Sequence, residues 1–165
     1  MLVFEVNNRI FNFLSDKIMK RFLIILFSIS SLSLYAQSYT QKRNDLFNRT
    51  EYYDSNGRMI GYSKTNDLFD REEFYNSHGN LQYTENWNDI FDRTEVRDRY
   101  GNIKATRSYN EILDREETKD TYGNISSYTQ WNDIYDRYDK YDSYGNKVGS
   151  YEYNDIYERW EYDDY

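Results

Sequence analysis

The stretch from Asn88 to Tyr109 reads NDIFDRTEVRDRYGNIKATRSY, and its pattern returns every 22 residues along the chain. Three residue types mark the period without an insertion. They are the asparagines Asn44, Asn66, Asn88, Asn110, Asn132 and Asn154, the glycines Gly57, Gly79, Gly101, Gly123 and Gly145, and the arginines Arg49, Arg71, Arg93, Arg115, Arg137 and Arg159. Such a period predicts a repeat architecture, in which each unit buries its apolar surface only against its neighbours.

The middle of each unit has the chemistry of a hairpin turn. Asp98 stands where the turn would begin, and Gly101 stands where the backbone needs a positive φ. We predict a three-residue loop, a type I turn closed by a residue in the left-handed conformation. The fold class is therefore all-β: tandem 22-residue β-hairpins that form an elongated antiparallel meander sheet or a solenoid-like array. Units start at residues 44, 66, 88, 110 and 132, and residues 154–165 are a half unit.

This turn implies a register for the two strands of a unit. Counting outward from it, Val96 is expected to pair with Lys104, and Phe91 with Tyr109. Such aromatic pairs contribute roughly 0.2–1 kcal/mol each. We interpret the face that carries them as the packed one.

The aromatic residues of this face are also the candidate binding residues. They are Phe69, Trp87, Phe91, Tyr109, Trp131, Tyr135 and Tyr153. Such a row can stack on sugars or pack against a protein. The alternative is that these rings form only the core.

Each recurring arginine has an acidic residue two positions later, as Arg93 has Glu95. Residues two apart on a strand point the same way, so this register places both on the aromatic face. We interpret the pairs as an ion-pair ladder between strands. The alternative is a row of arginines that binds carboxylate or phosphate ligands.

The second connection, between Tyr109 and Leu113, is harder to interpret. A three-residue linker, Asn110-Glu111-Ile112, would place an isoleucine in a left-handed position, which β-branched residues avoid. Either the loop is wider than three residues, or the chain steps there into a second layer. The recurring Ile or Leu of this loop is then expected to pack between units as a plug.

Composition excludes several classes of function. The chain has 165 residues with 20 Tyr, 19% aromatic content, no Cys, no Pro and a formal charge of -8. Such an acidic chain is a poor nucleic-acid binder, because phosphate binding needs a basic face. With no Cys and one His, His78, Cys/His nucleophile pairs and multi-His metal sites are excluded. We expect a non-enzymatic protein with no catalytic residues, no cofactor and no metal; calcium binding at acid pairs such as Asp89 and Asp92 is a weaker alternative.

The N-terminal part resembles an export signal. Met19-Lys20-Arg21 precedes a short apolar run that ends at Ala36. We therefore predict a signal peptide at residues 19–36, an over-extended start at residues 1–18, and a repeat domain at residues 37–165. The alternatives are a short anchoring helix and a genuine N-terminal extension. The mature chain is expected to lack a membrane span and to be secreted, periplasmic or at the cell surface.

The segments Tyr53-Asp54-Ser-Asn-Gly57-Arg58 and Tyr141-Asp142-Ser-Tyr-Gly145-Asn146 resemble the core of YD (RHS-type) repeats. The resemblance extends from Gln37 to the C-terminus and is specific at the turn. It implies β-hairpin sheets in a secreted or cell-surface protein. Residues 51–62 are also similar to a choline- or glucan-binding wall repeat, and the array has a weaker similarity to MORN-like hairpins.

These observations favour an exported interaction scaffold whose partner is a protein or a polysaccharide at the cell envelope. One alternative is a purely structural surface component that self-associates edge to edge, because an open sheet ends in unpaired strands. The half unit at residues 154–165 would then cap the array or accept a partner strand. A choline- or glucan-type wall-binding module is the other alternative.

Overall fold

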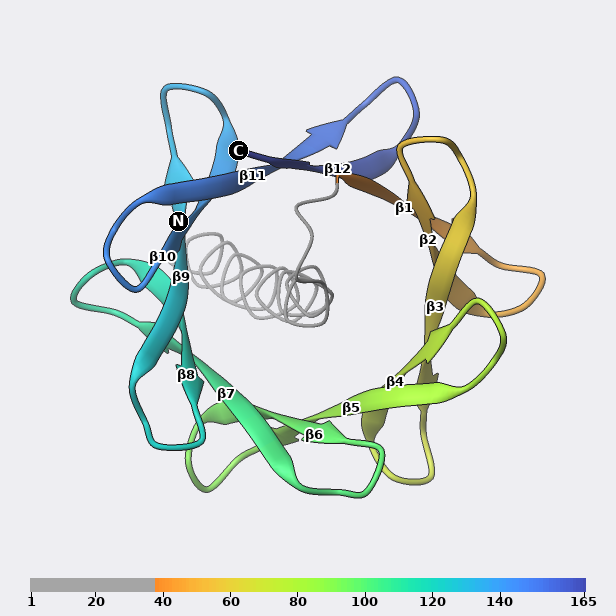
Figure 1. The fold of residues 1–165 in the computed structure, drawn as a ribbon, viewed down its shortest axis with the longest axis horizontal. Helices are drawn as coiled ribbons and strands as arrows, with labels where there is room; N and C mark the ends of the chain where they lie inside the picture. The colour runs from red at the N-terminus through yellow and green to blue at the C-terminus, as the bar shows by residue number, and fades with distance from the viewer. Residues whose placement is uncertain (1–37) are drawn as a thin grey trace, which may run out of the picture. The chain divides into compact units, whose positions relative to one another are not determined.

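The computed structural model describes residues 38–165, which form a single closed barrel of antiparallel strands (Figure 1). The strands are β1 (Tyr39–Asn44), β2 (Arg49–Asp54), β3 (Met59–Asn66), β4 (Arg71–Asn76), β5 (Leu81–Asn88), β6 (Arg93–Asp98), β7 (Ile103–Asn110), β8 (Arg115–Asp120), β9 (Ile125–Asn132), β10 (Arg137–Asp142), β11 (Lys147–Asn154) and β12 (Arg159–Asp164). The predicted all-β class and the repeated antiparallel hairpins are confirmed. The extension at residues 1–18 and the signal peptide at residues 19–36 lie outside the described residues.

The glycine turns have the predicted geometry. Gly101 has a φ of 88°, its N–H donates to the Asp98 carbonyl at 2.9 Å, and the Asp98 N–H donates to the Asn102 carbonyl at 2.9 Å. The Asp98 carboxylate accepts two further bonds, from the N–H groups of Tyr100 and Asn102, both at 2.9 Å. The fixed aspartate therefore satisfies backbone donors of the turn, which explains its place three residues before the glycine.

The predicted register fails one residue beyond the turn. Arg97 pairs with Ile103, but Val96 pairs with Ala105 instead of Lys104, because a β-bulge adds one residue to the second strand. The same shift occurs in the other four complete hairpins. A one-residue slip moves every following side chain to the opposite face. The predicted pairing of Phe91 with Tyr109, and the single aromatic face, are therefore wrong.

The second connection is wider than three residues. Asn110 pairs with Arg115, which leaves four loop residues, 111–114. The left-handed position is taken by Asp114, with a φ of 49°, and not by Ile112. The six equivalent positions hold Asn48, Asp70, Asp92, Asp114, Asp136 and Glu158, mostly the residue types that tolerate this conformation.

The predicted open meander or solenoid is wrong, because β1 pairs with β12 and closes the sheet. Gln41 lies opposite Trp160, and Tyr39 lies opposite Tyr162. The first complete unit has the same register at the equivalent positions, where Ser63 lies opposite Thr50 and Gly61 lies opposite Tyr52. The strand β1 thus supplies the second half of the half unit at residues 154–165, and the sixth hairpin is assembled from both ends of the described chain. The free edge strand predicted there is paired.

The barrel interior divides into an aromatic arc and a polar arc. The buried apolar side chains are Tyr39, Tyr52, Phe74, Tyr83, Val96, Tyr151 and Tyr162. Several of their rings stack, including Phe74 on Tyr83 at 4.3 Å and Tyr39 on Tyr162 at 5.2 Å between centroids. The strands β5, β7, β8 and β10 instead turn charged groups inward: Glu85, Arg107, Glu116 and Lys140.

Candidate binding surface

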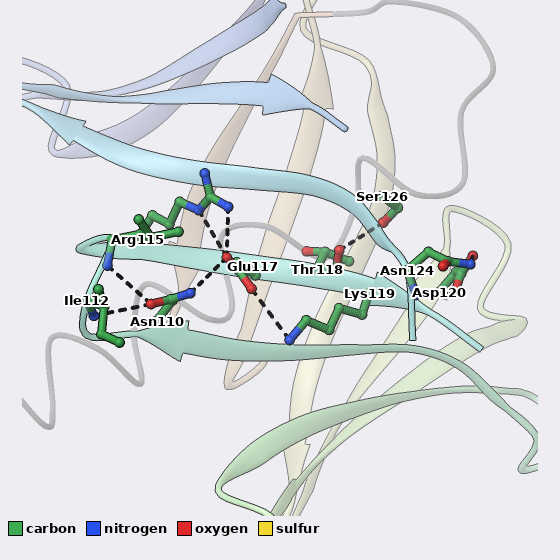
Figure 2. A network of polar contacts seen from close by, with 10 residues as sticks. Asn110, Ile112, Arg115, Glu117, Thr118, Lys119, Asp120, Asn124 and Ser126 are labelled. Atoms are coloured by element: carbon green, nitrogen blue, oxygen red, sulfur yellow. Dashed lines mark hydrogen bonds and ion pairs between the residues drawn. The ribbon is translucent and has the colours of Figure 1, made fainter. Parts of the chain in front are cut away.

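A repeated polar network on the outer face fixes the second connection of each unit, and Figure 2 shows it for the fourth unit. In the fourth unit, Glu117 accepts hydrogen bonds from Asn110 at 3.0 Å and from the Arg115 guanidinium at 2.8 Å, and Lys119 lies 3.4 Å away. The Asn110 side-chain oxygen accepts the backbone N–H groups of Ile112 and Leu113, both at 3.1 Å. The asparagine therefore ties the loop to the strand, which explains why it recurs.

In five of these networks the pKa of the acid lies below its ordinary value: Glu51, Glu73, Glu95, Glu117 and Asp139. Burial alone would raise the pKa of Glu117, but the hydrogen bonds from Arg115 and Asn110 outweigh it and hold the pKa below its ordinary value. The pKa of Glu73 is lowered for the same reason by Tyr75 and Arg71. Each recurring arginine contacts the acid two residues later on its own strand. The pairing is as predicted, but it runs within strands on the outer face and not between strands on an aromatic face.

The same arginines also cover aromatic rings of the loops. Arg71 lies over Phe69, Arg93 over Phe91 and Arg137 over Tyr135, with the guanidinium carbon 4.7–4.8 Å from the ring centroid. Cation–π contacts of this kind contribute about 0.5–1 kcal/mol at exposed sites. Because each guanidinium is engaged by a carboxylate, the predicted alternative of an arginine row for anionic ligands gains no support from this geometry.

Held in this way, each loop presents an apolar side chain to solvent. Because strands alternate in direction, all six loops lie at one end of the barrel, which we call the loop rim: residues 45–48, 67–70, 89–92, 111–114, 133–136 and 155–158. The exposed aliphatic residues are Leu46, Leu68, Ile90, Ile112, Ile134 and Ile156, at 84–93% exposure. The prediction that these residues pack between units as plugs is therefore wrong.

Carboxylates surround these apolar groups. The loops carry eleven acidic residues, and none of their residues is Lys or Arg. The acids are Asp45, Asp67, Asp89, Glu111, Asp133 and Asp155 at the first loop position, and Asp70, Asp92, Asp114, Asp136 and Glu158 at the last. The loop rim is therefore both apolar and negatively charged.

The seven predicted aromatic residues all lie at this end of the barrel, but in two sets. Phe69, Phe91 and Tyr135 belong to the loops and are 57–62% exposed. The other four are the last but one residues of the longer strands, lie on the inward-facing side and are 39–44% exposed: Trp87, Tyr109, Trp131 and Tyr153. The β-bulge explains why the two sets lie apart. It places the strand residues on the inner face of the barrel, whereas the Arg–acid network lies on the outer face.

Two members of the strand set join an aromatic cluster that the sequence indicated only in part. Trp131 packs edge-on against Tyr138 with centroids 4.7 Å apart, and Tyr153 packs against Trp160 at 5.3 Å. Tyr138 and Trp160 are 6.3 Å apart and connect the two pairs. An aromatic residue precedes four of the six recurring asparagines and indicated half of this cluster, whereas Tyr138 and Trp160 occupy positions that hold Thr or Glu in other units.

Deeper in the barrel, titratable groups approach one another. Glu85 and Arg107 form a buried ion pair, and burial raises the pKa of Glu85 to about 7 despite the opposing effect of Arg107. Burial also raises the pKa of Glu116 and lowers that of Lys140 to about 8. Among residues 38–165, no group of three or more His, Cys, Asp or Glu side chains is arranged to hold a metal ion. His78 lies exposed at the tip of a glycine turn, between β4 and β5.

Comparison with known proteins bears on the fold alone. No protein-family model matches the sequence, and no curated protein matches it. The structure is similar to the crystal structure of a protein from Arabidopsis thaliana, with a TM-score of 0.59 and 12% sequence identity over 79% of this chain and 80% of the plant protein. Within residues 38–165, no helix is long and apolar enough to cross a membrane.

Proposed function

We propose that this barrel is a non-enzymatic interaction module that binds a protein partner at the cell envelope through its loop rim. One observation carries the proposal: six Leu or Ile side chains, 84–93% exposed, stand at the same end of one small domain. Single exposed apolar residues are ordinary, but a set gathered on one surface is typical of interaction sites.

The loops are built to hold this surface in place. In each one, the side chain of the leading asparagine accepts a backbone N–H of the loop and donates to an acid on the next strand, as Asn88 does with Phe91 and Glu95. A surface fixed before binding loses less conformational entropy when a partner docks. The exposed residues are therefore presented in one arrangement and are not free to collapse onto the barrel.

Site-specific photo-crosslinking tests this proposal. A benzophenone amino acid at Ile112 in the full chain is expected to give a discrete crosslinked protein in cells, whereas one at Tyr122 on the opposite rim is expected to give none. Both positions are about equally exposed, at 93% and 89%. The double substitution Ile90→Asn with Ile134→Asn should abolish the Ile112 crosslink without lowering the melting temperature. An unchanged crosslink pattern, or the same pattern from Tyr122, would show that the loop rim is not the binding surface.

A carbohydrate partner is the second candidate. The half-exposed Trp131 and Tyr153, with Tyr138 and Trp160 beside them, form an aromatic cluster of the kind that stacks on sugar rings. A glycan array and polysaccharide pull-down with the wild type, Trp87→Ala and Trp131→Ala test it. Absence of binding by the wild type, or equal binding by folded variants, would eliminate this candidate.

We also propose that the protein is exported and is related to YD-type repeat proteins. Export and envelope location are supported by the signal-like segment at residues 19–36, and the YD-type resemblance by the hairpin repeats. Edge-to-edge assembly is less well supported, because β12 pairs with β1 within the chain and so is not an unpaired edge strand.

A further inference from the structure

We propose that the partner of the loop rim is a basic, apolar protein surface, in which lysine or arginine side chains alternate with apolar contacts. This inference deepens the proposed function and rests on it. It follows from the charge of the loops, which is independent of their apolar exposure.

Acidic residues are distributed around the whole loop rim. All six loops begin with an acid, and five of them end with one, on either side of the exposed Ile or Leu. Asp89 and Asp92, for example, flank Ile90 in the third loop, and all three residues are exposed. A partner that reaches the apolar groups must therefore also approach carboxylates on both sides.

The recurring arginine that follows each loop does not neutralise the loop acids. The guanidinium of Arg93 is 3.0 Å from Glu95 on the adjacent strand and covers the Phe91 ring. Arg71 and Arg115 make the equivalent contacts with Glu73 and Glu117. The positive charge of these arginines is thus engaged on the outer face of the barrel. Of the loop acids, Asp45 is paired with Arg43 and Asp114 accepts the Tyr109 hydroxyl, and the exposed acids of the other loops can pair with an external cation.

The negative charge of the loop rim opposes two other occupants. Two loop rims placed face to face would bring carboxylates against carboxylates, which opposes a dimer through this surface. The surface of an anionic membrane would be repelled in the same way, because the charges act within a Debye length of about 8 Å at physiological salt. A basic protein surface satisfies both the apolar groups and the acids.

Binding to defined probes tests this inference with the full-length protein. Three synthetic amphipathic peptides share the same leucine positions and carry Lys, Gln or Glu at their polar positions. The Lys peptide is expected to bind, with an affinity that falls as NaCl is raised, and the Gln and Glu peptides to bind at least about tenfold more weakly. Vesicles of phosphatidylcholine, with and without phosphatidylglycerol, and sedimentation of the protein alone test the lipid and self-association alternatives.

Two charge-matched variants separate the loop rim from the general acidity of the chain. Asp89→Asn with Asp133→Asn removes two loop-rim acids, whereas Glu152→Gln with Asp163→Asn removes two exposed acids from the barrel wall. The first pair should weaken Lys-peptide binding about tenfold, and the second pair should change it less than twofold. Equal effects of both pairs, tighter binding of the Gln or Glu peptide, vesicle binding, or a dimer disrupted by the loop-rim pair would overturn the inference. If the Ile112 crosslink persists in such a case, the proposed function stands and only the basic character of the partner is wrong.

Discussion

Charged residues in this barrel are placed in two contrasting environments. On the outer face, carboxylates such as Glu117 are covered but accept several hydrogen bonds, so their pKa values lie below the ordinary value. Inside, Glu85 and Lys140 are covered with fewer compensating partners, and burial shifts their pKa values toward the neutral forms. The first group therefore stabilises the fold at neutral pH, and the second opposes it.

Replacing Lys140 should stabilise the protein. Burial lowers the pKa of Lys140 from 10.5 to about 8; Asp164 opposes the shift and Arg107 adds to it. Below pH 8 Lys140 is charged in both the folded and the unfolded state, so the full free-energy cost of burying the charge lowers the stability of the fold. Between pH 8 and 10.5 only the unfolded chain keeps the proton, so this cost declines as the pH rises. We expect Lys140→Met to add about 3 kcal/mol at pH 7 and less at pH 10, measured by urea unfolding.

Lys42→Met is the control for this experiment, because Lys42 is an exposed residue. A change of less than about 0.5 kcal/mol is expected there. Equal effects of the two substitutions, or a gain from Lys140→Met that is the same at both pH values, would contradict the inward placement of Lys140.

Removing the charge of Glu117 should destabilise the protein only where the carboxylate is ionised. Its folded pKa is lowered, so its contribution is present above the unfolded pKa and is lost as the pH falls through the folded pKa. We expect Glu117→Gln to cost about 1–3 kcal/mol at pH 7 and much less at pH 3, by urea unfolding. The exposed loop residue Glu111, changed to Gln, should show no such difference. A constant cost at both pH values would mean that shape, and not charge, explains the recurring acid.

At the scale of the element, each unit is a hairpin with one glycine turn and one four-residue loop. The turn was predictable, because Asp and Gly at fixed spacing specify its hydrogen bonds, as in Asp98 to Gly101. The bulge was not predictable, because the inserted position holds a different residue type in each unit, such as Lys104 in the third. The sequence did contain a signal for the left-handed Asp92, since Asn, Asp or Glu stands directly before each of the six recurring arginines. The three-residue linker that we predicted placed Ile112 in the left-handed position instead.

The conformation of Asp92 gives a test within one loop. Its φ of 49° is tolerated by Asp and Asn and disfavoured for β-branched residues. We expect Asp92→Val to cost about 1–2 kcal/mol in unfolding free energy. Asp89→Val is the matched control, since it introduces the same side chain and removes the same charge from the same loop. If both substitutions cost the same, the loop does not have the left-handed geometry described here.

At the scale of the whole molecule, closure converts five and a half units into a ring of six. The sequence carries the necessary match, since Tyr39-Thr-Gln-Lys-Arg-Asn44 aligns with Tyr83-Thr-Glu-Asn-Trp-Asn88. Closure removes both sheet edges and gathers all six loops at one rim. In an open meander the exposed apolar residues would follow one edge of the sheet, whereas in the closed barrel they form a ring.

An engineered disulfide tests closure, because the chain contains no other cysteine. Thr40 and Glu161 are partners across β1 and β12, so Thr40→Cys with Glu161→Cys should form an intramolecular bond under mild oxidation. The bond would close a long loop and is expected to add about 4 kcal/mol of stability. Non-reducing electrophoresis and mass spectrometry measure it. Thr40→Cys with Thr106→Cys, a residue of β7, should give none. A disulfide-linked dimer from the first pair would instead indicate that chains join edge to edge.

The sequence by itself determined the period, the hairpins, the glycine turns and the pairing of each arginine with its acid. These features depend on residues within one unit, so the local pattern is sufficient to specify them. Only the tertiary structure decided which face is inside, that the sheet closes, and that Leu46 and its equivalents are exposed. The physical reason is that one bulge per hairpin reverses the facing of the strand residues beyond it, and closure depends on pairing between residues more than 100 positions apart, such as Gln41 and Trp160. The apolar, acidic loop rim results from those long-range contacts.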